Sequence, residues 1–409
     1  MDYDRFNDNS SYEMQKRKRI SEKAKKQRRK KLLKRRILIV LVCALILFLI
    51  IFLLVSLAKA IFKSDKKPAA SDNQATAVSE TVQDASEKVQ AVSNQTFEFK
   101  EPKIPDDSKS EGHYSAANGG IYIYNKTAFE LFGGSEDSAQ YYADAISSFK
   151  KSVGDKVRVY NMIVPNHTEF GLPRRLIKDS KVSTQIQADN IKEIYSRYSE
   201  DVIPINCYNQ LSDHVDEYIY FNTDHHWTGL GAYYAYTAFC EQTDQRTLDL
   251  SVCTEHTIDG FEGTLLDNDE SLKDNLDTVH FWTFPYETYA MRTAEMGQEA
   301  EKTTVYYEQE GSGPYAYGAF IWGDSPLFVE YNTEIDNNKK IAVVKESYGN
   351  AFVPYLTADY SEVHVIDFRY FSGSLKDYCS ENDIDEVLFI NNVMAANTAM
   401  QVDRITSIL

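Results

Sequence analysis

The chain of 409 residues carries a net charge of −17, which is unevenly distributed along it. Residues 1–36 contain 15 lysine and arginine residues but only 5 acidic ones, so the rest of the chain carries a net charge of −27. Such an acidic remainder argues against nucleic acid or another strongly anionic polymer as its main partner.

An uninterrupted apolar run follows the basic N-terminus. Residues 37–57 read ILIVLVCALILFLIIFLLVSL, without one charged residue. About 20 apolar residues cross a bilayer as a helix, the form in which every backbone group bonds internally. The basic flank predicts a cytoplasmic N-terminus. The run exceeds a typical signal-peptide core, and no convincing A-x-A site directly follows it. We therefore expect a cytoplasmic tail over residues 1–36 and one membrane-spanning helix over residues 37–58.

The remainder is expected on the outer side of the cell membrane. Residues 59–110 contain few large apolar side chains and cannot bury a core, which predicts a flexible linker. Aromatic and β-branched residues become frequent from Gly112 onward, so we place a folded extracytoplasmic domain over residues 111–409. Its cysteines could form two disulfides or remain buried thiols. They are Cys207, Cys240, Cys253 and Cys379.

Strand and helix patterns alternate in the first part of the domain. Strands are expected over residues 119–125, 156–165 and 201–206, and amphipathic helices over residues 138–153 and 185–199. This alternation favours an α/β fold with a mostly parallel sheet flanked by helices.

Residues 244–340 interrupt this rhythm. They are acidic and aromatic, and they predict an insertion rich in antiparallel strands. The alternation then returns with strands over residues 340–344, 362–368 and 385–390 and helices over residues 347–360 and 374–382.

The segment FNTDHHWTGLG brings an acidic residue close to two adjacent histidines. In an extended chain, residues two apart point to the same side. Asp224 could therefore fix the tautomer of His226, as in the base half of a serine hydrolase triad, with His225 on the other side. Alternatively, both histidines lie near a helix start capped by Thr228 and bond to the backbone. The sequence contains no H-E-x-x-H, H-x-x-x-H or C-x-x-C pattern, so we expect neither a metal nor a cofactor.

A histidine base requires a nucleophile, and two serines compete for this role. Ser347 in KIAVVKESYGNAFVPYL follows a β-branched strand and begins an expected helix, where an α/β enzyme exposes its nucleophile. The helix N-terminus would offer N–H groups to an oxyanion. Ser325 lies in a G-D-S sequence, but Pro326 and the following strand pattern favour a turn. We expect Ser347 as the nucleophile; its alternative role is a helix N-cap.

The T-D-H-H-W-T segment resembles the signature of the DHHW family, which is similar to the alginate O-acetyltransferases and, more distantly, to the SGNH hydrolases. The likeness extends from about Gly119 to the C-terminus through blocks such as IVPNHTEF, GAFIWGDSPLFVEY and KESYGNAFVPYL. It implies an SGNH-hydrolase-like sheet and the chain order Asp, His, Ser, which Asp224, His226 and Ser347 match.

Several positions depart from the pattern of such relatives. Glu346 stands where an aspartate usually precedes the serine, and Arg369 stands where SGNH enzymes carry an oxyanion glycine. Asn391 and Asn392 follow the third strand, and Asn391 is the favoured amide donor to an oxyanion. Asn350, just after the serine, is another candidate.

The resemblance implies acyl transfer. Ser347 would attack an acetyl donor, His226 would take its proton, and Asp224 would hold the imidazolium. The acetyl group would then pass to a sugar hydroxyl of a cell-surface or cell-wall polysaccharide. A multi-span membrane acyltransferase would supply the acetyl groups. Water as acceptor would make the protein an esterase instead, and a catalytically weak glycan-binding or scaffold protein is a further alternative. Substrate-contacting aromatic candidates are Trp227, Trp282, Trp322 and Tyr348.

Overall fold

The computed structural model describes residues 98–179, 181–307 and 313–409, all within one compact unit, Val78–Leu409. The expected cytoplasmic tail, membrane helix and first part of the linker lie outside these residues. Within them, no helix combines the length and apolar character that a membrane span requires. Residues 98–110, expected as the end of the linker, are held on the domain: the Lys100 amide donates to Asn209 at 2.9 Å, and Arg175 pairs with Asp106 at 2.9 Å.

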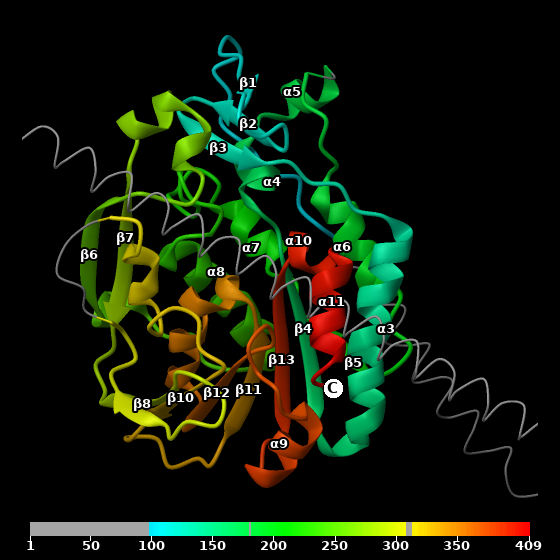
Figure 1. Ribbon diagram of the computed structural model, residues 1–409, viewed down its shortest axis with the longest axis vertical. Coiled ribbons are helices and arrows are strands. Elements are labelled where there is room, and N and C mark those ends of the chain that lie inside the picture. Colours follow the sequence, from blue (N-terminus) through cyan, green and yellow to red (C-terminus); the bar gives the residue numbers. More distant parts are fainter. Residues whose placement is uncertain (1–97, 180, 308–312) are drawn as a thin grey trace, which may run out of the picture. The chain divides into compact units, whose positions relative to one another are not determined.

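The domain is built on an eight-stranded sheet of order β5-β4-β13-β11-β12-β10-β8-β9 (Figure 1). The first five of these strands are parallel, and the last three add to them antiparallel. The parallel strands are β5 (Val202–Pro204), β4 (Arg158–Val164), β13 (Glu386–Asn392), β11 (Lys340–Lys345) and β12 (Glu362–Asp367). The antiparallel strands are β10 (Leu327–Asn332), β8 (Thr288–Thr293) and β9 (Glu301–Thr303). The expected α/β fold is therefore present, with a mixed sheet.

Helices cover both faces of the parallel half. On one face, Phe389 of β13 packs against Phe149 of α3, with ring centroids 5.4 Å apart. On the other face, Tyr160 of β4 packs against Phe239 of α8, also at 5.4 Å. The α-helices are α3 (Glu136–Val153), α4 (His167–Gly171), α5 (Arg174–Lys178), α6 (Gln187–Ser196), α7 (Tyr208–Asp213), α8 (Gly229–Thr243), α9 (Leu375–Glu381), α10 (Val393–Ala396) and α11 (Ala399–Thr406).

The strand expected at residues 119–125 does not join the parallel sheet. It forms β2 (Ile121–Tyr124) of a separate antiparallel sheet with β1 (His113–Tyr114) and β3 (Thr127–Glu130). Asn125 and Lys126 connect β2 to β3 with φ angles of 48° and 59°, the left-handed conformation of a tight hairpin turn. The short turn returns the chain beside β2 before any crossover helix can begin.

The insertion, residues 244–340, contains antiparallel strands as expected, but it is not a separate body. Strands β6 (Thr254–Phe261) and β7 (Asp277–Thr283) form a two-stranded sheet of their own. Strand β10 pairs with β12, so β8, β9 and β10 extend the central sheet.

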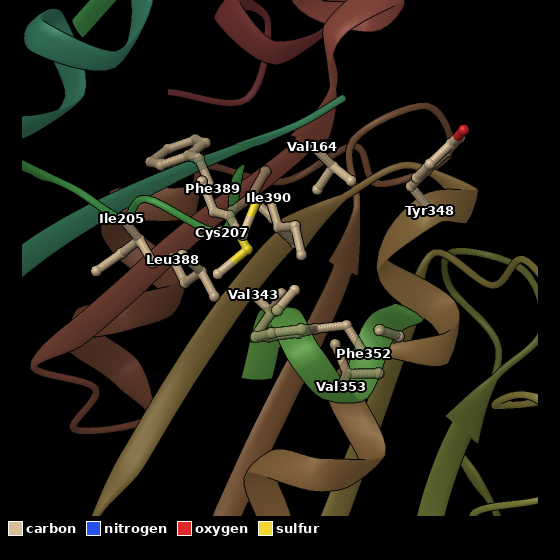
Figure 2. Packing of buried hydrophobic residues seen from close by; sticks show 14 of the residues in the cluster. Val164, Ile205, Cys207, Val343, Tyr348, Phe352, Val353, Leu388, Phe389 and Ile390 are labelled. Atoms are coloured by element: carbon tan, nitrogen blue, oxygen red, sulfur yellow. The ribbon is translucent and has the colours of Figure 1, made fainter. Parts of the chain in front are cut away.

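The single helix expected over residues 347–360 is instead two 3₁₀ helices, η6 (Ser347–Ala351) and η7 (Val353–Ala358). Pro354 has no N–H to continue an α-helical ladder through this segment. Val343 of β11 lies close to Phe352 and Val353 in the buried core beneath this segment (Figure 2). The turn that carries Ser347 is therefore packed onto the sheet.

The four cysteines of the described residues are all free, which excludes the disulfide alternative there. Cys207 is buried beside Ile205 and Leu388 (Figure 2). Burial raises the pKa of Cys207 to about 12, as it does for Cys240 and Cys379, so these thiols remain protonated and unreactive at neutral pH.

Candidate active site

Asp224, His226 and Ser347 meet in one continuous chain of hydrogen bonds. His226 Nδ1 lies 2.6 Å from Asp224 Oδ1, and His226 Nε2 lies 2.8 Å from Ser347 Oγ. Asp224 and His226 are buried, whereas Ser347 is half-buried. An ionised aspartate accepts the Nδ1 proton, which leaves the Nε2 lone pair to accept the serine hydroxyl proton. This geometry is that of a nucleophile, a base and a group that orients the base.

The second carboxylate oxygen of Asp224 is held by Thr264 of the insertion. The Thr264 amide and hydroxyl donate to Asp224 Oδ2 at 2.8 and 2.9 Å. Burial by itself would raise the pKa of Asp224, but the charge and hydrogen bond of His226, the interaction with His225 and the hydrogen bond from the Thr264 amide lower this pKa well below its usual value. Asp224 therefore stays ionised.

Gly263 permits the close approach that Thr264 needs. A side chain at Gly263 would place its Cβ 2.3 Å from the carbonyl carbon and oxygen of Thr223, a separation that no Cβ can adopt. The Gly263 amide instead donates to the Thr223 hydroxyl at 3.1 Å.

His225 does not point away from Asp224, contrary to the expectation from an extended chain. The segment bends, and the rings of His225 and His226 lie 3.8 Å apart between centroids. His225 Nδ1 is 3.6 Å from Asp224 Oδ1, beyond hydrogen-bond range, and bonds to Thr264 Oγ1 at 2.8 Å. His226 is thus the partner of Asp224, through its side chain and also through its backbone amide, which donates to Asp224 Oδ1 at 3.0 Å.

The donor atoms of Asp224, His225 and His226 could also surround a metal ion, because they lie within 4.8 Å of one another. The bend brings the two adjacent histidines together, which an extended chain would not do. The Nδ1 atoms of both histidines nevertheless have hydrogen-bond partners in the protein, Thr264 for His225 and Asp224 for His226. His226 Nε2 bonds to Ser347. The set therefore fits a hydrogen-bonded triad better than a metal site.

Glu346 fixes the turn that presents Ser347. Its carboxylate accepts from the amides of Tyr348 at 3.0 Å and Asn392 at 2.8 Å, and one oxygen lies 3.5 Å from Ser347 Oγ. The side chain is buried, and burial raises the pKa of Glu346. The longer glutamate thus caps η6 where an aspartate is usual, joining the ends of β11 and β13.

Trp227 and Tyr348, which were expected to contact substrate, both have buried side chains. The Trp227 indole donates to the Tyr348 carbonyl at 2.8 Å, and the Tyr348 hydroxyl donates to the His225 carbonyl. These two residues instead tie the histidine segment to the serine segment. Trp282 is also buried, whereas Trp322 is partly exposed, with Tyr307 at a ring-centroid distance of 4.2 Å.

Of the suggested side-chain donors to an oxyanion, Asn350 is engaged elsewhere, whereas the side-chain nitrogen of Asn391 is buried without a hydrogen-bond partner among the described residues. Asn391 lies on the α3 face of β13, where its side-chain oxygen accepts a hydrogen bond from Tyr142 at 2.6 Å. The backbone amide of Asn392 donates to the Glu346 carboxylate. Successive strand residues point to opposite faces, so Asn391 is directed away from the serine turn. Asn350 donates to Asp324 at 3.2 Å.

Arg369 and Asp324 belong to an ion network beside Ser347. Arg369 pairs with Asp367 at 2.6 Å and with Asp324 at 2.8 Å, and buried Lys345 pairs with Asp367 at 2.9 Å. Burial opposes ionisation of Asp324, but Lys345 and Arg369 lower its pKa to about 2. The network anchors the segment before Ser325 to the sheet. Ser325 itself is buried and accepts from Arg292 at 2.9 Å, as a turn residue would.

Tyr317 of the insertion forms a wall of the site. Its ring stacks on the His226 ring at 4.0 Å and 10°, and its hydroxyl donates to the Ser347 carbonyl at 3.0 Å. Sequence reasoning missed Tyr317 and Thr264, which are distant in sequence from the histidines and the serine. Their only signal was the nearby GAFIWGDSPLFVEY block, which contains Asp324.

Comparison with known proteins gives one family. The family model described as DHHW protein matches residues 99–366. The chain is similar to a crystal structure of a DHHW family protein from Eubacterium siraeum, with 30% identity, a TM-score of 0.65, and coverage of 73% of this chain and 98% of that one. Bacillus cereus PatB1, solved with a sulfonyl adduct, shares the fold at 19% identity, a TM-score of 0.56 and coverage of 69% and 96%. No curated protein matches. The chain belongs to the DHHW family.

Proposed function

We propose that the protein is a membrane-anchored, extracytoplasmic O-acetyltransferase that modifies a cell-surface or cell-wall polysaccharide. The observation that carries this proposal is the hydrogen-bonded chain from Asp224 through His226 to Ser347. The resemblance of the DHHW family to the alginate O-acetyltransferases and SGNH hydrolases supports an acetyl group as the cargo.

The proposed reaction needs two steps at one serine. Ser347 Oγ bonds to the acetyl carbon while its proton moves to His226 Nε2, and His226 then returns this proton to the oxygen of the departing donor. In the second step, a sugar hydroxyl gives its proton to His226 and takes the acetyl group, and Ser347 regains a proton. Asp224 holds the imidazolium in both steps. An esterase would differ only in using water as acceptor.

The proposed location follows from the apolar run over residues 37–57 and the basic tail before it. A linker beyond the membrane helix would tether the site near the envelope. The donor in this arrangement is a multi-span membrane acyltransferase that presents acetyl groups on the outer side.

The proposal is tested on the full-length protein with p-nitrophenyl acetate and with a sulfonyl fluoride that modifies activated serines. Wild-type protein should release nitrophenol and carry the sulfonyl label on Ser347. Ser347→Ala and His226→Ala should lose both, whereas Ser325→Ala, the matched control, should keep both. Label on Ser325, or no label and no turnover in the wild type, would overturn the proposal in favour of another nucleophile or a scaffold role.

An experiment in cells can distinguish acetyl transfer from ester hydrolysis. Cells that express Ser347→Ala should contain less O-acetyl group on envelope polysaccharide than cells that express the wild type, when alkali-released acetate is measured. A larger amount of acetyl group in the variant would identify an esterase.

A further inference from the structure

His225 has no role in the proposed reaction, although it lies beside the triad. About a third of its side chain is exposed, at 31%, while its ring adjoins His226. Its hydrogen bond to Thr264 determines which of its two nitrogens carries the proton.

The Thr264 hydroxyl settles the tautomer of His225. This hydroxyl has one proton, and ionised Asp224, which can only accept, receives it at 2.9 Å. The 2.8 Å contact between Thr264 Oγ1 and His225 Nδ1 must then have the imidazole as donor. Neutral imidazole with a proton on Nδ1 carries its lone pair on Nε2. Burial and neighbouring His226 lower the pKa of His225, which keeps the ring neutral.

The Nε2 nitrogen of His225 has no hydrogen-bond donor in the described part of the protein, and the same holds for the carboxyl group of Glu130. Among residues 98–179, 181–307 and 313–409, no hydrogen bond reaches His225 Nε2 or the carboxylate of Glu130 at the end of β3. Glu130 is half-buried, and burial raises the pKa of its carboxyl group. An imidazole nitrogen without a donor, in a ring that lies beside His226, favours a ligand that donates hydrogen bonds, as sugar hydroxyls do.

We propose that His225 Nε2 binds the sugar acceptor by accepting a hydrogen bond from a hydroxyl next to the one that is acetylated. The adjacent rings then serve two neighbouring hydroxyls: His226 takes the proton of the reacting hydroxyl, and His225 holds its vicinal partner. The inference rests on the proposed function and adds its acceptor class, a sugar with a free vicinal diol. No covalent step involves His225.

The test compares two simple acceptors, trans-1,2-cyclohexanediol and cyclohexanol, with p-nitrophenyl acetate as donor and the full-length protein. The measured quantity is the ratio of acetylated alcohol to free acetate, which does not depend on how fast the acyl-serine forms. One added hydrogen bond should make the wild-type ratio about tenfold higher for the diol. His225→Phe keeps a ring but no acceptor and should reduce this preference to about two, the statistical value for two equivalent hydroxyls against one. His225→Gln, which offers an amide oxygen, should retain part of it.

His113→Phe is the matched control, because His113 is an exposed histidine on β1 that pairs with Asp269. It should retain the full diol preference. Wild-type protein without a diol preference above the statistical value, or His225→Phe with an unchanged one, overturns the inference while nitrophenol release still supports the triad. Absence of nitrophenol release in the wild type overturns the proposed function itself. If His225→Phe fails to fold by circular dichroism, His225→Gln and the wild-type comparison decide.

Discussion

The parallel half of the sheet and the insertion contribute to the site in different ways. The parallel strands β11, β12 and β13 end at Lys345, Asp367 and Asn392, so they position the proposed nucleophile, Ser347, and supply the frame around it. The insertion supplies no member of the triad, yet Thr264 holds the aspartate and Tyr317 covers the histidine. The nucleophile therefore belongs to the scaffold, whereas the orientation of the base depends on the insertion.

A second brace from the insertion lies just before the histidines. Buried Asp277 of β7 accepts from the amides of Asn222 at 2.7 Å and Thr223 at 2.8 Å. These bonds fix the bend that brings Asp224 to His226. The insertion therefore acts as part of the site, although it contributes no residue to the triad. Variants in each region can test this.

The largest effect is expected where both regions meet, at Asp224. Asp224→Asn removes the charge and lets His226 carry its proton on Nε2, so the base can no longer accept the proton of Ser347. We expect kcat/KM for p-nitrophenyl acetate to fall about 10³- to 10⁴-fold, as for other triads. A fall below tenfold would mean that Asp224 does not orient His226.

A smaller loss is expected from the insertion side of the same contact. Thr264→Val keeps the amide that donates to Asp224 but removes the hydroxyl, so kcat/KM should fall roughly 10- to 100-fold, the range for a lost bond to a charged group. Thr254→Val, at an exposed position of β6, is the matched control and should behave as wild type. Equal activities of Thr264→Val and Thr254→Val would show that the insertion does not orient the triad.

Two variants of Tyr317 can distinguish the contribution of its ring stacking from that of its hydrogen bond. Tyr317→Leu loses both the ring against His226 and the bond to the Ser347 carbonyl, and should lower kcat/KM about tenfold. Tyr317→Phe keeps the ring and should lower it about threefold. The same loss in both variants would assign the whole effect to the hydroxyl.

The sequence predicted the parallel half better than the insertion for a physical reason. Runs such as those of β11 and β13 are apolar throughout because helices cover both faces, and this pattern is local. The pairing of Asp224 with His226 is also local, as is the strand-and-turn pattern that selected Ser347 over Ser325, and the family resemblance added the chain order Asp, His, Ser. The contacts of Thr264 and Tyr317 join segments far apart in sequence, and no local pattern reports them.

Two errors have the same origin. The apolar pattern of β2 suits either sheet, so only the left-handed turn at Asn125 and Lys126 decided its pairing. The apolar residues after Ser347 suit an α-helix as well as the two 3₁₀ helices η6 and η7. In both cases tertiary packing chose between conformations that the sequence pattern leaves equal.

The smallest effect on activity is expected on the other side of the insertion, where a substitution should change the stability of the fold instead. Glu330 of β10 is buried, and neither carboxylate oxygen has a hydrogen-bond partner. Burial raises the pKa of Glu330 well above its usual value, so the folded protein keeps this group protonated while the unfolded chain ionises it. Its stabilising effect is therefore complete at low pH and declines by up to about 1.4 kcal/mol per pH unit as the pH rises past roughly 4.5.

Glu330→Gln removes this ionisation, so the variant should become progressively more stable than the wild type between pH 5 and pH 8 in urea unfolding. Glu301→Gln, at an exposed position of β9, is the control and should follow the wild type at every pH. A constant difference between Glu330→Gln and wild type across this range would show that Glu330 is ionised in the folded state. Together with unchanged nitrophenol release, the predicted trend would confine the role of the insertion in catalysis to the segments that touch the triad, since β10 could then be altered without loss of activity.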